Sequence, residues 1–249
     1  MLTEERRNLI VQKVEEKGSV SVQELMELLG ASESTIRRDL HELDRKSLLL
    51  KVHGGAVAVS GTITSDVMVA EREVLHREIK MEIARYAASL ITDDDVVFLD
   101  AGTTTGFIPD FLTCTDAVFI TNAISHARKL CSMGYQVYMP GGMLKIKTEA
   151  LIGGQTCQFL GKFHFTKGFF GTNGVTVEEG FTTPDIQEAA VKELALKQSR
   201  KRYIVTDSSK FDMISTVRFA GFTDADVITD SGLRTKYRNK ENILIYDQK

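Results

Sequence analysis

Two adjacent arginines, Arg37 and Arg38, stand in the segment STIRRDLHEL of a chain whose formal net charge is -3. An arginine side chain can donate two parallel hydrogen bonds to the edge of a guanine or to a phosphate. If this segment is helical, the ridge opposite its apolar side chains collects cationic and hydrogen-bonding groups: Ser34, Arg38, His41 and Arg45. Such a ridge can read DNA, although an ordinary solvated helix face carries the same residue types.

A second group of residues that could bind a ligand lies in the segment FLDAGTTTG. It contains Asp100, Gly102 and the run Thr103, Thr104, Thr105. Gly102 permits a sharp turn, and the threonines offer hydroxyl and backbone N–H groups where we expect a helix to begin. Phosphate is the anion that such a turn suits best. The same residues also suit a simple capped turn, and no Gly-Lys-Ser/Thr follows as in a Walker A loop.

Polar residues and glycines also follow other expected strands. They are Thr121 and Asn122, Gly141 and Gly142, Gly171, Thr172 and Asn173, and Asp207 and Lys210. The carboxyl ends of strands in an open parallel sheet meet at one edge, where ligands bind. We therefore expect these groups to hold a phosphate and several hydroxyls, with Lys210 as the charge partner of the phosphate.

The elements that position the arginines are expected to be three helices and a hairpin. Residues 3–17 have helical periodicity, and Ser21 with Glu24 predicts a capping box for a second helix that ends at Gly30. Ser32 is the expected N-cap of a third helix that runs to about Arg45. Two short helices joined by a tight turn are typical of a helix-turn-helix.

Residues 48–59 read as a hairpin around His53-Gly54-Gly55, which completes a winged helix over residues 1–58. Lys51 and His53 in this hairpin would lie beside the DNA backbone. Residues 59–76 lack periodicity and are interpreted as a linker.

Residues 77–249 alternate helical and strand-like segments, with helices expected at 77–90, 123–133 and 185–201. Seven apolar strands are expected, at 96–100, 117–121, 136–140, 167–171, 203–207, 226–230 and 243–247. Short apolar strands separated by helices predict a mostly parallel sheet covered on both faces.

The composition of the whole chain narrows the class of protein. The 249 residues are 43% hydrophobic and 26% charged, which is typical of a soluble globular protein. We expect no membrane span and no secretory signal. The three cysteines, without a Cys-x-x-Cys pair, fit three buried thiols in a reducing cytoplasm. Because the chain is slightly acidic, any contact with DNA must come from a local face.

The segment GSVSVQELMELLGASESTIRRDLHELDRKSLLLKVHGGA resembles the N-terminal domain of the DeoR-type family of bacterial repressors. The resemblance implies a recognition helix over Ser32 to Arg45 that enters the major groove of operator DNA. Thr35, Arg37 and Arg38 match the motif of the family. Ala31 and Ser47 depart from its commonest residues, Val and Gly, and Ser47 puts the geometry of the turn before the wing in doubt.

The C-terminal part resembles the same family through LDAGTTT, TNA, GG, GTNGV, GFTTPD and DSSKF. This resemblance implies an α/β, Rossmann-like sensor domain that is similar to sugar-phosphate isomerases such as ribose-5-phosphate isomerase and that senses phosphorylated sugars. The expected function is an operator-binding repressor of a sugar-utilisation operon, acting as a homo-oligomer, either a dimer or a tetramer. Release of DNA on effector binding is also implied by the resemblance alone.

The alternative is a sugar-phosphate isomerase or deaminase. Such an enzyme needs a placed acid or base, and the candidates are Asp100, Asp185, Glu188 and Asp207. No histidine stands at the Asp-Gly-His spacing of hexosamine-phosphate deaminases, and the five histidines form no metal-binding spacing. We therefore expect a sensor without catalytic residues, metal or cofactor.

Overall fold

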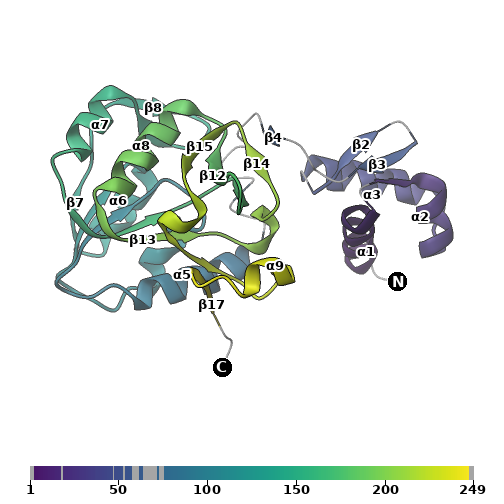
Figure 1. Ribbon diagram of the computed structural model, residues 1–249, viewed down its shortest axis with the longest axis horizontal. Coiled ribbons are helices and arrows are strands. Elements are labelled where there is room, and N and C mark those ends of the chain that lie inside the picture. The colour runs from purple at the N-terminus through teal and green to yellow at the C-terminus, as the bar shows by residue number, and fades with distance from the viewer. Residues whose placement is uncertain are drawn as a thin grey trace. The chain divides into compact units, whose positions relative to one another are not determined.

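The computed structural model describes residues 3–17, 19–46, 48–52, 54–57, 62–63, 72 and 76–246, and it separates two units, Met1–Gly61 and Thr62–Lys249 (Figure 1). Each unit has a core of its own. The boundaries expected at residues 58 and 76 stay predictions, because most of the segment between them lies outside the described residues.

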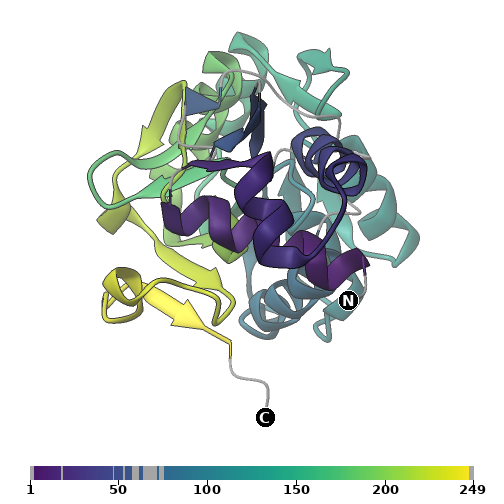
Figure 2. The ribbon, with the colours of Figure 1, turned by 90° about the vertical axis from the view of Figure 1, so that its right-hand side faces the viewer.

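The N-terminal unit contains the expected helices, α1 (Thr3–Lys17), α2 (Val22–Leu29) and α3 (Glu33–Arg45). They are the purple to dark blue helices of Figure 2. The expected hairpin consists of β2 (Leu50–Val52) and β3 (Gly55–Val57). A strand that was not foreseen, β1 (Ser19–Ser21), pairs antiparallel with β3. The unit is therefore a helix-turn-helix with a wing.

Local signals fix where α2 and α3 begin and end. Ser21 accepts a hydrogen bond from the backbone N–H of Glu24 at 3.2 Å, and the Glu24 carboxylate accepts one from the N–H of Ser21 at 2.8 Å. This reciprocal pair is the predicted capping box. Gly30 ends α2 in the left-handed conformation, with φ 60°, and Ser32 caps α3 as predicted.

All seven expected strands form one parallel sheet in the C-terminal unit, in the order β17-β16-β13-β10-β5-β6-β7. Their bounds are β5 (Val96–Leu99), β6 (Val118–Thr121), β7 (Gln136–Tyr138), β10 (Phe165–Phe170), β13 (Ser199–Val205), β16 (Asp226–Thr229) and β17 (Ile243–Ile245). The chain moves outward in one direction from β5 and in the other from β10. The switch point of this Rossmann-like sheet therefore lies between β5 and β10.

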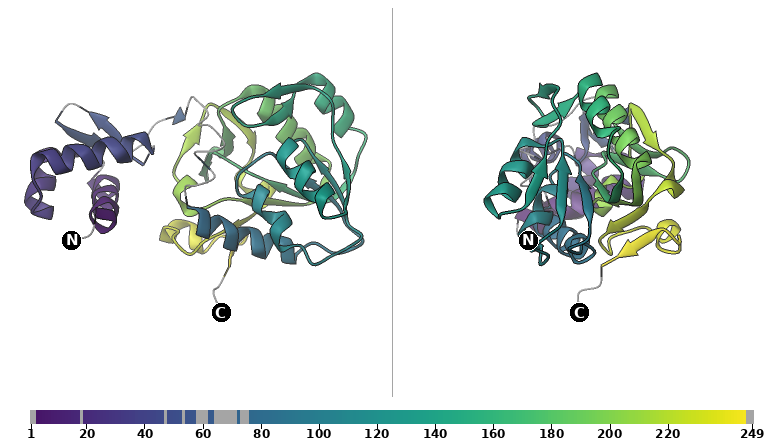
Figure 3. Two further views of the ribbon diagram at one scale, coloured as in Figure 1. Left: turned by 180° about the vertical axis from the view of Figure 1, so that it is seen from behind. Right: turned by 90° about the vertical axis from the view of Figure 1, so that its left-hand side faces the viewer.

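Helices cover both faces of the sheet, because its strands alternate apolar side chains between two clusters. Phe98 of β5 packs with α7 (Gly154–Leu160) and α8 (Ile186–Lys197). Its neighbours Val97 and Leu99 pack with α5 (Arg77–Ser89), the 3-10 helix η1 (Thr105–Phe111) and α6 (Ile124–Ser132). Figure 3 gives two further views of these helices against the sheet.

Two expectations need correction, and the segment read as a linker contains a strand that was not foreseen. The helix expected over 185–201 ends at Lys197, because Ser199 already pairs with Phe165 and the pairing overrides helical periodicity. Within the segment read as a linker, β4 (Thr62–Ile63) pairs with β14 (Ile214–Ser215). The cysteines are not all buried, since Cys131 is exposed and Cys157 is partly so.

Short antiparallel pieces surround the main sheet. One is the hairpin of β8 (Met143–Lys145) and β9 (Ala150–Ile152), and another joins β11 (Gly174–Thr176), β12 (Gly180–Thr183) and β15 (Val217–Ala220). The remaining short elements are η2 (Ser208–Lys210), η3 (Phe222–Asp224) and α9 (Thr235–Arg238). Among the helices described, none combines the length and apolarity needed to cross a membrane.

Candidate DNA-binding and effector sites

The orientation of α3 is fixed by the apolar side chains that its inner face buries. Ile36 and Leu40 are fully buried, and Leu43 is 2% exposed. Asp39 is also buried and accepts hydrogen bonds from Arg6 Nε at 2.6 Å and Arg7 Nε at 2.8 Å. Burial alone would raise the pKa of Asp39, but the two guanidinium groups lower it below its usual value. This double ion pair ties α3 to α1.

The outward face of α3 carries the predicted ridge. Arg38 and His41 are exposed, and neither side chain has a partner among the residues that the structure describes. Arg37 pairs with Glu33 at 2.7 Å, and Arg45 pairs with Glu42 at 2.9 Å, both on the helix surface. Exposed pairs of this type are weak and can be exchanged for other anionic partners.

The beginning of α3 and the wing hold the other predicted contacts. The Ser32 hydroxyl lies 3.1 Å from that of Ser34 and 2.9 Å from that of Thr35, so these hydroxyls form a cluster at the helix N-terminus. Lys51 on β2 has an exposed side chain. His53 lies outside the described residues, as does Ser47.

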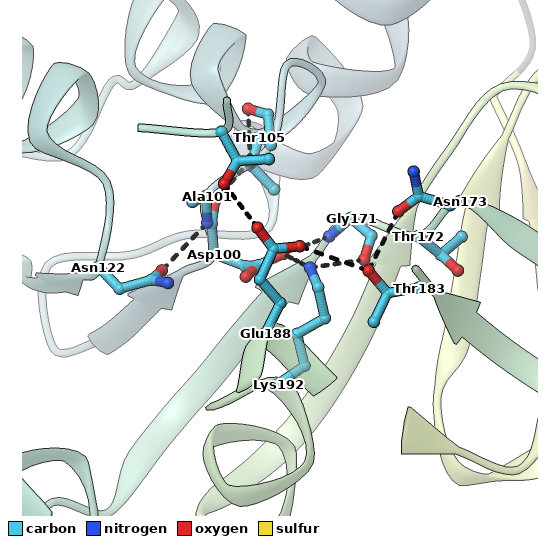
Figure 4. Close-up of polar contacts among 12 residues, drawn as sticks. Asp100, Ala101, Thr105, Asn122, Gly171, Thr172, Asn173, Thr183, Glu188 and Lys192 are labelled. Carbon is cyan, nitrogen blue, oxygen red and sulfur yellow. Dashed lines mark hydrogen bonds and ion pairs between the residues drawn. The ribbon is translucent and has the colours of Figure 1, made fainter. Parts of the chain in front are cut away.

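The switch point of the sensor sheet holds a buried ion pair. Asp100 follows β5 and is 2% exposed, and its Oδ2 atom accepts a hydrogen bond from the backbone N–H of Gly171 at 3.0 Å. The same oxygen pairs with Lys192 Nζ on α8, which also donates to the Gly171 carbonyl at 3.1 Å. Two predicted residues, Asp100 and Gly171, are thus brought together by a lysine that the sequence did not single out (Figure 4).

A second buried carboxylate stands one turn earlier on α8. Glu188 is 8% exposed and accepts a hydrogen bond from Thr148 Oγ1 at 2.5 Å. Lys145 Nζ lies 3.2 Å from Glu188 Oε1, and Thr183 Oγ1 lies 3.5 Å from Glu188 Oε2. Thr183 also donates to Asn173 Oδ1 at 3.2 Å, which links this carboxylate to the predicted residues after β10 (Figure 4).

Lys192 was missed for a physical reason, and Glu188 was named only as a candidate acid or base of an enzyme, not as part of this network. Glu188 and Lys192 are one helical turn apart and therefore lie on the same face of α8. That face is buried, since Val191 and Ala195 around them are fully covered. Charged residues at buried positions of an amphipathic helix are the signal that could have revealed them, because an unpaired buried charge is too costly to keep.

The glycine-threonine loop has two kinds of threonine. Thr105 is fully buried, and its hydroxyl donates to the carbonyls of Asp100 at 2.7 Å and Gly102 at 2.9 Å, so it shapes the turn. Thr103 and Thr104 have neither hydroxyl nor backbone N–H bonded to another group within the described ranges. The loop leads into the seven-residue 3-10 helix η1, not the expected α-helix. Any anion would therefore rely on the loop itself and little on a helix dipole.

A neutral histidine lies beside this loop. Burial lowers the pKa of His126 to about 4, against the opposing effect of its hydrogen bond with the Gly102 backbone. A Cβ atom at Gly106 would come within 2.8 Å of His126 Nε2, so the close packing requires glycine there. The imidazole thus fills space next to the loop and carries no charge near neutral pH.

The other predicted residues divide into two groups. Asn122 accepts a hydrogen bond from the Ala101 N–H at 3.1 Å, and Thr121 accepts one from the Ala123 N–H at 3.1 Å, so both order the edge of the sheet. The Gly141 carbonyl accepts from Thr156 at 2.8 Å, and Gly142 has φ 141°. Thr172 donates to the Gly174 carbonyl at 2.9 Å.

Asp207 and Lys210 form the second group, after β13. Burial would raise the pKa of Asp207, but the charge of Lys210 and the Ser209 hydroxyl lower it, with smaller effects from His76 and Lys80. Lys210 is therefore a charge partner of Asp207. Over residues 76–246, no hydrogen bond or ion pair joins Lys210 to the Thr103–Thr105 loop.

Known protein families match both units. The family model of the DeoR-like helix-turn-helix domain matches residues 6–62, and that of the DeoR C terminal sensor domain matches residues 75–231. The chain belongs to the DeoR family. It is a transcriptional regulator with an N-terminal helix-turn-helix and a C-terminal DeoR-type sensor domain, as the sequence motifs implied.

Relatives in the DeoR family match almost end to end. The chain is 43% identical to the uncharacterized HTH-type transcriptional regulator FruR of Bacillus subtilis, over 96% of this chain and 95% of the relative. It is 36% identical to the HTH-type transcriptional regulator GlpR of Haloferax volcanii, over 96% and 94%. It is 34% identical to a lactose phosphotransferase system repressor of Staphylococcus epidermidis, over 97% and 96%.

Some solved structures share part of the fold of the C-terminal unit at low sequence identity. A ribose 5-phosphate isomerase A from Methanocaldococcus jannaschii aligns with 54% of each chain, at 14% sequence identity and a TM-score of 0.40. No conclusion about activity follows from a likeness at this level.

Proposed function

We propose that the chain represses genes of sugar utilisation by inserting α3 into the major groove of operator DNA, and that a phosphorylated sugar controls this binding. The observation that carries the proposal is the outward ridge of α3. Its residues Arg38 and His41 are exposed without partners among the described residues, while the opposite face of the same helix is buried. A rigidly held helix whose outward ridge carries an unpaired arginine suits groove insertion.

The effector is proposed to bind at the carboxyl edge of the sensor sheet. The backbone N–H and hydroxyl groups of Thr103 and Thr104 are available for a phosphate. Asp100, Lys192 and Glu188, whose contacts are drawn in Figure 4, offer charged hydrogen-bonding groups for sugar hydroxyls. Gly102 and Gly171 permit close approach of the ligand, because no side chain stands at either position.

Relatives support a link to sugars. Their names include a lactose phosphotransferase system repressor and a putative aga operon transcriptional repressor. We propose the same class of target genes for this chain, which would act in the cytoplasm as a homo-oligomer, with operator DNA and a phosphorylated sugar as partners. No cofactor or metal is part of the proposal.

The second candidate function is an enzyme acting on sugar phosphates. It is favoured by the two buried carboxylates, Asp100 and Glu188, at the proposed effector site. Both are held in place by ion pairs with lysines, Asp100 with Lys192 and Glu188 with Lys145. We propose that they bind sugar and catalyse nothing. Measurable isomerase or deaminase turnover on a panel of sugar phosphates would refute this.

Two measurements test the proposed function. Operator sequences selected from a random DNA pool should bind the chain, and the variant Arg37→Ala/Arg38→Ala should lose that binding without losing its fold. The matched control is Arg85→Ala, an exposed arginine of α5. A thermal-shift screen of phosphorylated hexoses, pentoses and deoxyribose should find an effector, because a ligand of the folded state raises its stability. Wild-type DNA affinity in the double variant would refute the role of α3.

A further inference from the structure

In the hairpin of β8 and β9, strand β9 buries Ala150 and Ile152, whereas β8 and the turn after it expose apolar side chains. Lys145 and Thr148 point inward, with the Lys145 side chain 15% exposed and Thr148 4% exposed. Leu144 and Ile146 point outward and are 45% and 80% exposed. Apolar residues are normally the ones that a surface hairpin buries. The outer face of this hairpin therefore suits contact with another molecule better than contact with water.

Neighbouring segments extend the apolar surface. Ile186 is 71% exposed and follows Asp185, which pairs with Lys145 of the hairpin at 3.2 Å. Ile124 is 40% exposed, and its N–H donates to the Glu149 carbonyl at 3.4 Å. Five of the eight large exposed hydrophobic residues described in the C-terminal unit lie in these three joined segments: Ile124, Met143, Leu144, Ile146 and Ile186. We call these five residues the apolar face.

The apolar face is rigidly connected to the proposed effector site. Asn122 donates to the Leu151 carbonyl at 3.2 Å, and the Asn122 carbonyl accepts from the Leu151 N–H at 2.7 Å. On the other side, Glu188 accepts a hydrogen bond from Thr148 and forms an ion pair with Lys145 of the hairpin. A ligand that displaces Glu188 or Asn122 would therefore move the hairpin as well.

We infer that the apolar face is a self-association surface, on which a second copy of this chain docks about a two-fold axis. The charges beside it favour this occupant. Lys147 and Glu149 are both exposed and flank buried Thr148 at the tip of the hairpin. Opposite charges side by side suit self-association, because a two-fold axis passing beside Thr148 would place each lysine opposite the glutamate of the other copy.

The proposed function adds one reason for choosing a second copy, and the inference rests on that function only in this respect. Helix-turn-helix proteins read paired half-sites with two recognition helices, so the regulator needs another copy of itself. Large exposed apolar surfaces on soluble proteins mark interaction sites. The apolar face provides one, and its connection to Glu188 couples it to the sensor site.

The test is the mass of the full chain in solution, measured by sedimentation equilibrium without DNA or sugar. We expect the wild type to be a dimer or larger, and the variant Leu144→Asp/Ile146→Asp to associate at least tenfold more weakly. Met133→Asp is the matched control, because Met133 is 46% exposed but lies outside the apolar face. Circular dichroism should show native folding in both variants, since the replaced side chains are exposed.

Charge exchange provides a second test that does not depend on removing apolar groups. Lys147→Glu should weaken association, and Lys147→Glu/Glu149→Lys should restore it, because the swapped pair is again complementary across the two-fold axis. A monomeric wild type at tens of micromolar, an unchanged mass in the aspartate variant, or no recovery in the exchanged variant would overturn the inference.

A thermal-shift titration of the aspartate variant with sugar phosphates separates this result from the proposed function. A variant that keeps the wild-type mass but loses the shift would mean that the hairpin is a lid over the effector, which also overturns the inference. A variant that becomes monomeric while keeping the shift supports it. An absence of any shift in the wild type would count against the proposed effector and leave the mass measurement intact.

Discussion

Each of the two units contains buried ionic residues that join its own elements. Moving charges out of water is costly, so a buried pair persists where its geometry is good and where it has a role. Asp100 with Lys192 forms such a pair at the switch point, and Asp39 with Arg6 and Arg7 forms another inside the helix-turn-helix. The first pair faces the proposed ligand and the second only joins two helices. The consequences of breaking them should therefore differ.

Replacing Lys192 by Met should leave Asp100 buried without its cation. We expect the free energy of unfolding to fall by about 3–5 kcal/mol. The double variant Asp100→Asn/Lys192→Met should recover much of that stability but not effector binding. Urea unfolding and sugar-phosphate titration measure the two quantities. The control is Lys197→Met on the same helix, an exposed residue paired with Glu193, which should change little. Full effector affinity in the double variant would contradict the proposed site.

Replacing Asp39 by Asn tests the pair in the DNA-binding unit through its pH dependence. The pKa of Asp39 is lower in the folded chain than its usual value of 3.8. The stabilisation is therefore complete above pH 3.8 and is lost as the pH falls through the folded-state pKa. Asp39→Asn should unfold at lower urea concentration than wild type at pH 7, with a difference that shrinks toward pH 3. Exposed Asp94→Asn is the control, and a difference independent of pH would contradict this role.

At the scale of elements, features that depend on residues close together in the sequence could be predicted. Features that depend on residues far apart in the sequence could not. The capping box at Ser21 and Glu24 and the left-handed Gly30 are determined by residues a few positions apart, so the bounds of α2 were predictable. The end of α8 depends on Ser199 pairing with Phe165 of another strand. The β8–β9 hairpin likewise depends on Glu188 and Asn122, which are distant in sequence. Of the candidate site, the strand ends were predicted, Glu188 of α8 was named only as a candidate acid or base, and Lys192 was not predicted.

The glycine-threonine loop is predicted to bind the phosphate group of the effector. If Thr103 and Thr104 bind phosphate, a phosphorylated sugar should bind and its unphosphorylated counterpart should not, because the available N–H and hydroxyl groups would stay unused. Thr104→Val should weaken binding of the phosphorylated sugar by about 1 kcal/mol, the value of a typical hydrogen bond. Thr115→Val, in an exposed turn, is the control. Isothermal titration with both sugars measures the effect, and equal binding of the two would refute a phosphate site.

At the scale of the whole molecule, two binding events must be linked. An effector can change DNA affinity only if it binds two conformations of the chain with different affinities. The hairpin is the element best placed to differ, because it contacts Glu188 and Asn122 on one side and carries the apolar face on the other. If two copies meet there, its displacement changes the spacing of two recognition helices. That spacing is strict, since half-sites lie about 34 Å apart.

A fragment of residues 1–61 should therefore bind DNA but not respond to sugar. It should fold alone, because α1, α2, α3 and the wing share a core that includes fully buried Ile10, Leu25 and Ile36. Without paired recognition helices it should bind operator more weakly than the full chain. In the full chain, DNA should change effector affinity by the same factor as effector changes DNA affinity. Fluorescence anisotropy with and without sugar phosphate measures both. Full-strength, sugar-sensitive binding by the fragment would contradict coupling through oligomer geometry, because the fragment contains neither the sensor sheet nor the apolar face.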